Sequence, residues 1–175
     1  IKEEQKLTDC VSVRHGIKES MLRQIKKRKK FVDSNLNWKK EISKNNIRTH
    51  PVATTVHYQT FTEKVDWIEA FAKRKFSQYT MSLLKQEPNM LIPVHVDSYY
   101  FFKKTFKVNK KQKVYRANIF LEDWKPGHYF EVNNKPCVNW KAGQYILLDQ
   151  TMWHRSGNVG VDKKYTAQVT GVLKV

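Results

Sequence analysis

The feature that most constrains the fold is a series of short strand-like segments in the second half of the chain. They are rich in β-branched and aromatic residues, which favour strands, and they span Tyr79–Leu84, Leu91–Val96, Val114–Leu121, Tyr129–Val132, Gln144–Leu148 and Tyr165–Leu173. Turn-forming Gly, Pro and Asn residues separate them, at residues 87–89, 125–127, 133–136, 141–143 and 157–160. Short strands with regular turns and no helix between them predict a β-sandwich or β-barrel.

The first part of the chain has a different pattern. Residues 63–76 predict the clearest helix, because apolar residues recur on one face, at Val65, Ile68, Ala72 and Phe76. Ile17–Val32 also has roughly helical spacing, whereas Val52–Phe61 is typical of a strand. At 175 residues a single domain is expected. We predict a helical N-terminal part with one strand over 1–77 and an all-β part over 78–175.

Composition narrows the class of protein. A hydrophobic content of 40%, with 13% aromatic residues, indicates a packed globular domain rather than a disordered chain. No run of 18 apolar residues is present, so no membrane span or membrane association is predicted. Cys10 and Cys137 lie far apart and form no CxxC pair, which argues against a disulfide framework or a zinc ribbon. This usage favours the cytoplasm, or the host cytoplasm if the protein is viral.

The net charge of +17 predicts attraction to polyanions such as nucleic acid, anionic lipid or an acidic protein. The cations are mostly lysines, however, and surfaces that clamp phosphate usually favour the bidentate fork of arginine. The run KKRKK at 26–30 is a candidate phosphate contact, although such runs are more often solvent-facing. The charge therefore leaves two interpretations open, polyanion binding and a lysine-rich background composition.

Two histidines and an aspartate predict a metal site. The segment Leu91–Val96 runs into His95-Val96-Asp97, and residues i and i+2 of a strand face the same side. A third ligand must come from a distant strand, and His154, after the segment Gln144–Leu148, is the candidate. Two histidines and one carboxylate form the facial triad of non-haem Fe(II) oxygenases. His-x-Asp alone is a weak motif, but the later histidine beyond several strands strengthens the prediction.

Other polar residues lie near these positions in the sequence. Lys164 and Thr166 have i,i+2 spacing on the last predicted strand, so a cation and a hydroxyl could bind one carboxylate together. His128 is an alternative third ligand, but too few strands separate it from His95, and a loop or substrate-side position is favoured. Arg155 follows His154 and should point to the opposite face, so a functional role is the weaker interpretation.

An aromatic cluster, Tyr99 to Phe102, follows His-x-Asp directly. It is explained equally well by core packing of a strand and by a substrate-facing wall, with Tyr99 as the substrate-side candidate. Trp140 and Gly143 are interpreted as packing and a turn at a corner of the barrel rather than as catalytic residues.

The β-rich part resembles the core of the Fe(II)/2-oxoglutarate-dependent oxygenase superfamily. The resemblance is nearest to the aspartyl/asparaginyl β-hydroxylase-like group and to small oxygenases of phage type. It covers about residues 78–173, and its segments are IPVHVD (92–97), YRANIFLEDWKPGHYFEV (115–132), WKAGQYILLD (140–149), HRSGNVG (154–160) and KYTAQVTG (164–171). It implies a mainly β fold with N-terminal helices, built on a double-stranded β-helix, the jelly-roll or cupin-like barrel.

The resemblance also implies roles for individual residues. His95, Asp97 and His154 match the iron ligands. Lys164 matches a position that is usually Arg and pairs with the distal carboxylate of 2-oxoglutarate, and Thr166 matches the hydroxyl of that motif. Arg116 matches an arginine that contacts the co-substrate, in a motif that is often Arg-x-His. This chain has Arg116-Ala117-Asn118 there, which makes Asn118 a further candidate contact.

The implied reaction is hydroxylation of a C–H bond, with Fe(II), O2 and 2-oxoglutarate, which becomes succinate, and with ascorbate as a possible support. We expect a protein or peptide side chain as the first substrate, a nucleic-acid base as the second and a free amino acid as the third. The rival prediction is a basic, non-catalytic β-barrel that binds nucleic acid or an acidic partner. The complete triad together with Lys164 argues against this rival. The sequence does not specify the oligomeric state.

Overall fold

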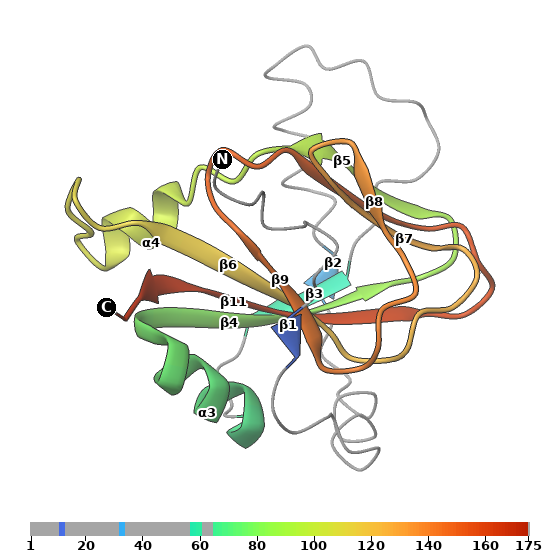
Figure 1. Ribbon diagram of the computed structural model, residues 1–175, viewed down its shortest axis with the longest axis horizontal. Helices are drawn as coiled ribbons and strands as arrows, with labels where there is room; N and C mark the ends of the chain where they lie inside the picture. The colour runs from blue at the N-terminus through green and yellow to red at the C-terminus, as the bar shows by residue number, and fades with distance from the viewer. Residues whose placement is uncertain (1–10, 13–31, 34–56, 61–64, 175) are drawn as a thin grey trace, which may run out of the picture.

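The computed structural model describes residues 11–12, 32–33, 57–60 and 65–174. They form two antiparallel sheets that face each other (Figure 1). The large sheet has the order β1 (Val11–Ser12), β9 (Gln144–Leu148), β6 (Val114–Phe120), β11 (Lys164–Leu173), β4 (Phe76–Gln86), β3 (His57–Thr60) and β2 (Val32–Asp33). The small sheet has the order β5 (Met90–His95), β10 (His154–Asn158), β7 (His128–Val132) and β8 (Lys135–Cys137).

The chain passes back and forth between the sheets. From β4 onward it enters the small sheet at β5, at β7 with β8, and at β10, and returns each time to the large sheet. The last strand, β11, lies between β4 and β6 and pairs with both, so it forms the centre of the large sheet. This is the double-stranded β-helix of cupin-like proteins, and the predicted fold class is confirmed.

Helix α3 (Asp66–Lys75) covers the outer face of the large sheet. Its apolar side, with Ile68 and Phe71, packs on strand residues that point away from the small sheet. These strand residues include Leu83, Ala117, Ile119, Ala167 and Val169. Burying a side chain such as Phe71 contributes roughly 1.5–3 kcal/mol. Acidic residues in the first turn and basic residues in the last turn also suit the helix dipole. The helix predicted over 63–76 is confirmed.

A second apolar cluster fills part of the space between the sheets. It combines inward-facing residues of both layers, namely Phe120, Phe130, Val132, Cys137, Trp140, Ile146 and Leu148. The Trp140 and Phe120 rings stack with 4.0 Å between centroids, so the predicted packing role of Trp140 is confirmed. The remaining inward positions are polar, and they form the site described below.

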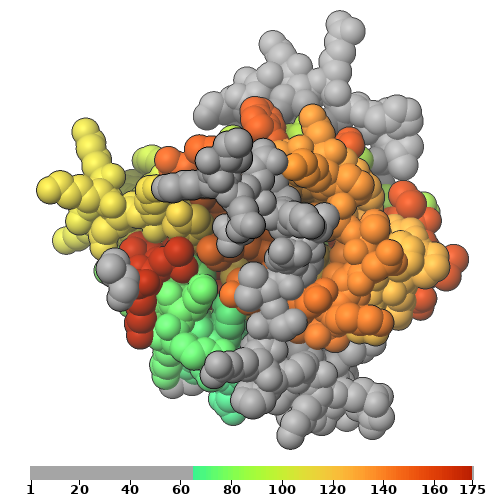
Figure 2. Space-filling view, in the orientation of Figure 1, coloured from blue at the N-terminus to red at the C-terminus, as the bar shows by residue number. Residues whose placement is uncertain are grey.

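The structure corrects three local predictions. The predicted turn at 133–136 is shorter, because Asn133 and Asn134 adopt positive φ angles and β8 resumes at Lys135. The predicted turn at 157–160 begins later, because Gly157 belongs to β10 and lets the side chain of Leu91 approach closely. The interpretation of the aromatic cluster as a strand was wrong, because Tyr100–Thr105 forms helix α4. In Figure 2, α4 and the loop that follows it project at the left edge of the molecule.

The N-terminal part contributes three short strands, β1 to β3, to the large sheet rather than the single strand predicted. Residues 57–60 agree with the strand predicted over Val52–Phe61. Of the helix predicted over Ile17–Val32, Val32 belongs to β2, and the rest, with the basic run at 26–30, lies outside the described residues. Neither helix of the described part has the length and apolar character needed to cross a membrane.

Candidate metal centre

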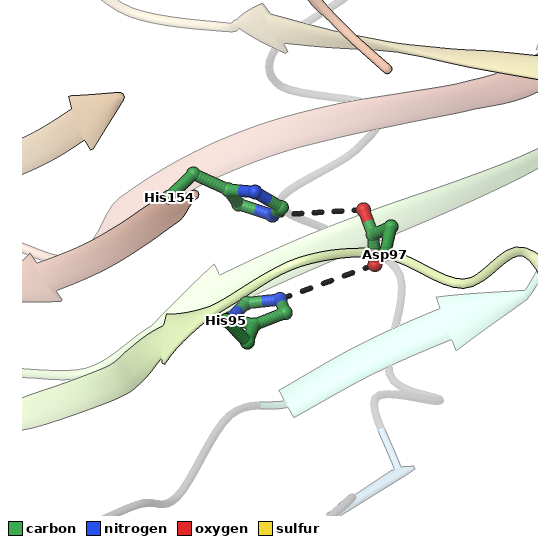
Figure 3. A group of neighbouring side chains, drawn as sticks. All are labelled: His95, Asp97 and His154. Atoms are coloured by element: carbon green, nitrogen blue, oxygen red, sulfur yellow. Dashed lines mark ion pairs between the residues drawn. The ribbon is translucent and has the colours of Figure 1, made fainter. Parts of the chain in front are cut away.

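His95, Asp97 and His154 come together at one end of the small sheet (Figure 3). His95 is the last residue of β5 and His154 the first of β10, and the two are directly paired across the strands. Asp97 follows β5 and points between the two rings. His154 Nε2 lies 3.5 Å from Asp97 Oδ2, and His95 Nε2 lies 3.9 Å from Asp97 Oδ1. One ligand atom from each residue lies within 4.8 Å of the others.

Hydrogen bonds to the backbone orient both histidine rings. His95 Nδ1 lies 2.7 Å from the Pro93 carbonyl oxygen, and His154 Nδ1 lies 3.0 Å from the Met152 carbonyl oxygen. In each case Nδ1–H donates, which leaves the Nε2 lone pair directed at Asp97. Metal-binding histidines are usually held in this way, by a carbonyl or carboxylate behind the ring. Burial, reinforced by the neighbouring His95, lowers the pKa of His154 and favours the neutral, ligating form.

Three electron-pair donors therefore converge on one point without a proton between them, which favours a cation there. A metal bound about 2.1 Å from each donor bridges atoms up to about 4.2 Å apart. The two nitrogen–oxygen distances given above lie below this value, each to a different oxygen of Asp97. Asp97 Oδ2 is also buried, and its one partner among the described residues other than His154 is the ion pair with Arg116. The donor set could thus hold a metal ion.

Arg116 on β6 lies against the metal ligands. Its Nη1 is 2.7 Å from Asp97 Oδ2, and its Nε donates to Thr170 Oγ1 at 3.1 Å. The sequence resemblance placed this arginine on the co-substrate, but here its charge neutralises the aspartate. Tyr99 completes this corner, since its ring lies 5.4 Å from the Arg116 guanidinium carbon and its hydroxyl donates to the Leu148 carbonyl oxygen.

Lys164 lies deep between the sheets and is only 2% exposed. Its ammonium donates to the Tyr129 carbonyl oxygen, to Ser156 Oγ at 2.7 Å and to the Gly157 carbonyl oxygen at 3.4 Å. In the described part of the chain no carboxylate forms an ion pair with it. Burial without an acidic partner lowers the pKa of Lys164 to about 7, far below its ordinary value of 10.5.

Phe130 connects Lys164 with the triad. Its ring stacks on His154 with centroids 6.3 Å apart, and the Lys164 ammonium lies 5.7 Å from the same ring. Trp140 lies on another side of the ammonium, at 5.4 Å. One of the metal ligands and the buried cation thus contact the same aromatic ring between the two sheets.

Further polar side chains line this interior from the large sheet. Thr166 shares the inward face of β11 with Lys164 and is buried. Asn118 on β6 is buried as well; its Oδ1 accepts from Gln168 Nε2, while its Nδ2 has no hydrogen-bond partner. An unsatisfied buried donor is costly, so it favours an acceptor in this space. The structure therefore brings Lys164, Thr166, Asn118 and Arg116 to the same interior as the triad.

Two predicted substrate-side residues do not reach it. His128 pairs with Asn158, at the end of β10 remote from His154, and its Nε2 contacts the Asp162 carbonyl oxygen. Arg155 points outward and forms an ion pair with Glu131 at 2.8 Å, beside Tyr129. Its opposite orientation to His154 agrees with strand alternation.

Sequence reasoning missed the partners of Lys164. Ser156 donates to Gln86 Oε1 at 2.7 Å while it accepts from the lysine. A signal for Ser156 existed, because it lies two residues after His154 and would share its face once β10 is recognised as a strand. The sequence contains no such signal for the Tyr129 carbonyl or for Gln86, because their positions next to Lys164 and Ser156 depend on how the two sheets pack.

Comparisons with known proteins found likeness only among solved structures. The sequence matches no protein-family model and no curated protein. Among solved structures, a Pseudomonas putida prolyl-4-hydroxylase matches with a TM-score of 0.54 and 8% identity, over 94% of this chain and 91% of that one. A predicted oxalate decarboxylase from Thermotoga maritima matches at 0.43 and 18% identity, over 68% and 82%. A cupin-2 domain protein from Rhodospirillum rubrum matches at 0.44 and 7% identity, over 71% and 64%.

The likeness to the prolyl-4-hydroxylase agrees with the fold described above. The chain is a cupin-like double-stranded β-helix with a His-Asp-His group that could bind a metal ion. At this level of identity the likeness concerns the fold alone, so the chemistry must be argued from the chain's own residues.

Proposed function

We propose that this protein is an Fe(II)- and 2-oxoglutarate-dependent oxygenase that hydroxylates a C–H bond of its substrate. The observation that carries the proposal is that two features lie between the sheets and both contact Phe130: a His-Asp-His group, and a buried lysine that forms no ion pair with any described residue. A metal site alone is compatible with many cupin-like proteins. A buried cation next to it favours a co-substrate that is itself an anion.

The metal would be held by His95, Asp97 and His154. A set of two histidines and one carboxylate would leave coordination positions of the ion available for small ligands. When bound, the iron and 2-oxoglutarate together supply the oxidising chemistry, in which O2 converts 2-oxoglutarate to succinate and CO2 and one oxygen atom enters a substrate C–H bond. The backbone carbonyls behind His95 and His154 keep both rings in the ligating tautomer.

Lys164 would receive the distal carboxylate of 2-oxoglutarate. Its present hydrogen-bond partners are neutral oxygens, and a carboxylate would make a stronger, charge-assisted bond with the ammonium. Thr166 on the same face would add a hydroxyl hydrogen bond, and Asn118 Nδ2, which has no partner among the described residues, would donate to another oxygen of the co-substrate. Phe130 and Trp140 keep water from the ammonium, which strengthens its attraction for an anion.

The test is succinate formation from 2-oxoglutarate under air, with Fe(II) and ascorbate. We expect slow turnover by the wild type, even without the true substrate, and none by His154→Ala. The matched control is His128→Gln, which changes a histidine at the far end of the same sheet and should retain turnover. Equal turnover by His154→Ala and the wild type would contradict the proposal, because the product would then come from free iron.

A silent wild type leads to a second measurement, the calorimetric titration of Mn(II) and then 2-oxoglutarate into the protein. Binding of both, lost in His154→Ala, supports an oxygenase that waits for its substrate. Absence of binding favours the other candidate function, a basic non-catalytic β-barrel. The observation in favour of that candidate is the net charge of +17.

A further inference from the structure

Cations without acidic partners are concentrated in the segment that follows the metal ligand Asp97. Between Asp97 and Glu122 the sequence contains no acidic residue, whereas lysines occur at 103, 104, 107, 110, 111 and 113. All of these lysines except Lys103 are exposed. Within the described part of the chain none of the six forms an ion pair, and Lys103 donates to Gln150 Oε1 instead. The segment thus presents a positive surface to an external anion.

The same segment exposes two aromatic rings. Phe101 is 81% exposed and Tyr100 is 60% exposed, and the rings meet edge to face with 5.5 Å between centroids. Phe102 and Phe106 lie on the other side of α4, where they pack against Val114 and its neighbours. α4 therefore has enough apolar residues to anchor it without the two exposed rings, and exposed aromatic pairs are typical of binding surfaces.

The position of α4 is fixed relative to the metal centre. Tyr99, two residues after Asp97, adopts a left-handed backbone conformation and starts the helix. Its buried side chain binds the Leu148 carbonyl oxygen, and its ring lies against Arg116. Lys103 ties the helix to Gln150, in the loop that leads to His154. The exposed rings therefore stand on a rigid support within a few residues of a metal ligand.

A partner must combine negative charge with flat apolar groups to match this surface. Single-stranded nucleic acid does so, because its phosphates pair with lysines and its unpaired bases stack on aromatic rings. A duplex keeps its bases stacked inside, and an acidic peptide supplies charge with few rings. We infer that α4 and the loop after it, residues 98–113, form a docking surface for single-stranded nucleic acid. If the proposed function holds, a base of the bound strand is the substrate group that reaches the metal centre.

The experiment is fluorescence anisotropy with a labelled oligothymidylate of about 20 nucleotides, titrated at several salt concentrations. The charge variant is Lys104→Gln, Lys107→Gln, Lys110→Gln and Lys111→Gln combined. Each lost phosphate contact should lower the slope of log affinity against log salt by about 0.7, so the variant should lose up to about three. The control removes four cations elsewhere, with Lys73→Gln, Arg74→Gln, Lys135→Gln and Lys174→Gln, and should keep the slope.

The stacking variant is Tyr100→Ala with Phe101→Ala. It should weaken binding about five- to a hundredfold and leave the salt slope unchanged, since stacking is not a charge effect. Val159→Ala with Val161→Ala is its control, because these side chains are also exposed but lie in the loop after β10. Polyglutamate and anionic lipid vesicles serve as competitors and should displace the oligonucleotide poorly.

Three results would overturn the inference: equal losses in the charge variant and its control, no effect of the stacking variant, or efficient displacement by polyglutamate or vesicles. The last would assign the surface to an acidic protein or a membrane. Because binding is measured without iron or 2-oxoglutarate, it is independent of the proposed activity. Oligonucleotide binding with a failed succinate assay would refute the oxygenase alone, and the reverse pattern would refute the docking surface alone.

Discussion

The two faces of the large sheet show how one set of strands serves two purposes. On β11, Ala167 and Val169 point outward into an apolar cluster beneath α3, whereas Lys164 and Thr166 point inward toward the metal ligands. Beneath α3 the outward face is packed with aliphatic and aromatic side chains, so its role is stability. The inward face combines a buried cation, an unsatisfied amide and a hydroxyl, none of which stabilises an empty barrel. Alternation with period two thus separates stability from chemistry along a single strand.

The largest expected effect concerns the metal ligands, on the inward side of the barrel. Asp97→Ala removes the only carboxylate of the group and leaves Arg116 without its partner. We expect Mn(II) affinity, measured by calorimetry, to fall at least about a hundredfold. Such a loss exceeds the one typical when a residue that only orients a metal ligand is removed. Asp149→Asn, which removes a carboxylate from the loop after β9, should retain the wild-type affinity.

The outward face should show the opposite behaviour. Phe71→Ala opens a cavity among Phe76, Tyr145 and the strand residues beneath α3. The free energy of unfolding in urea should decrease by about 3–5 kcal/mol, the usual cost of such a truncation. Mn(II) affinity of the folded protein should be unchanged. A large loss of metal affinity in this variant would show that the two faces are not independent.

A smaller effect is expected for the buried cation. Lys164→Met keeps the length of the side chain but removes the charge, and a hydrogen bond to a charged group contributes about 1.5–3 kcal/mol. 2-Oxoglutarate affinity for the Mn(II)-loaded protein should therefore fall about ten- to a hundredfold, while Mn(II) affinity stays constant. Lys163→Met, at an exposed neighbouring position, is the control. Unchanged 2-oxoglutarate binding in Lys164→Met would mean that another residue holds the distal carboxylate.

The smallest effect is a dependence of stability on pH. Burial lowers the pKa of Lys164 to about 7, whereas the unfolded chain has the ordinary value of 10.5. Between these pH values the unfolded state binds more protons, so the contribution of Lys164 to the free energy of unfolding rises with pH. Urea unfolding at several pH values should show a rise that Lys164→Met lacks and Lys163→Met retains. Identical slopes in all three proteins would contradict a buried, unpaired Lys164.

The sequence was sufficient for most strands from β4 onward and for the grouping of the triad. The i,i+2 spacing of His95 and Asp97 and the strands before His154 carry that prediction, because alternation and barrel closure are local or topological rules. β10 was missed because His154–Asn158 contains no strongly strand-forming residues. It is a strand because β5 and β7 pair with it on both sides, and tertiary pairing outweighs local preference.

Side-chain partnerships were harder to predict than positions. The ion pair of Arg116 with Asp97 was not predicted, because it depends on the separation of the two sheets, and the co-substrate contact of Arg116 stays a prediction. The hydrogen bonds of Lys164 to Tyr129 and Gly157 involve backbone carbonyls, which every residue has and no motif records. The helix α4 was missed because its aromatic residues favour strands, whereas the left-handed turn at Tyr99 and the packing of Phe102 start and hold the helix.

The most direct test of the account is a crystal structure of the protein grown without oxygen in the presence of Mn(II) and 2-oxoglutarate. The account predicts Mn(II) bound by His95, Asp97 and His154, with the 2-oxo acid end of the co-substrate on the metal and its distal carboxylate at Lys164. The metal at other residues, or the distal carboxylate directed away from Lys164, would contradict it.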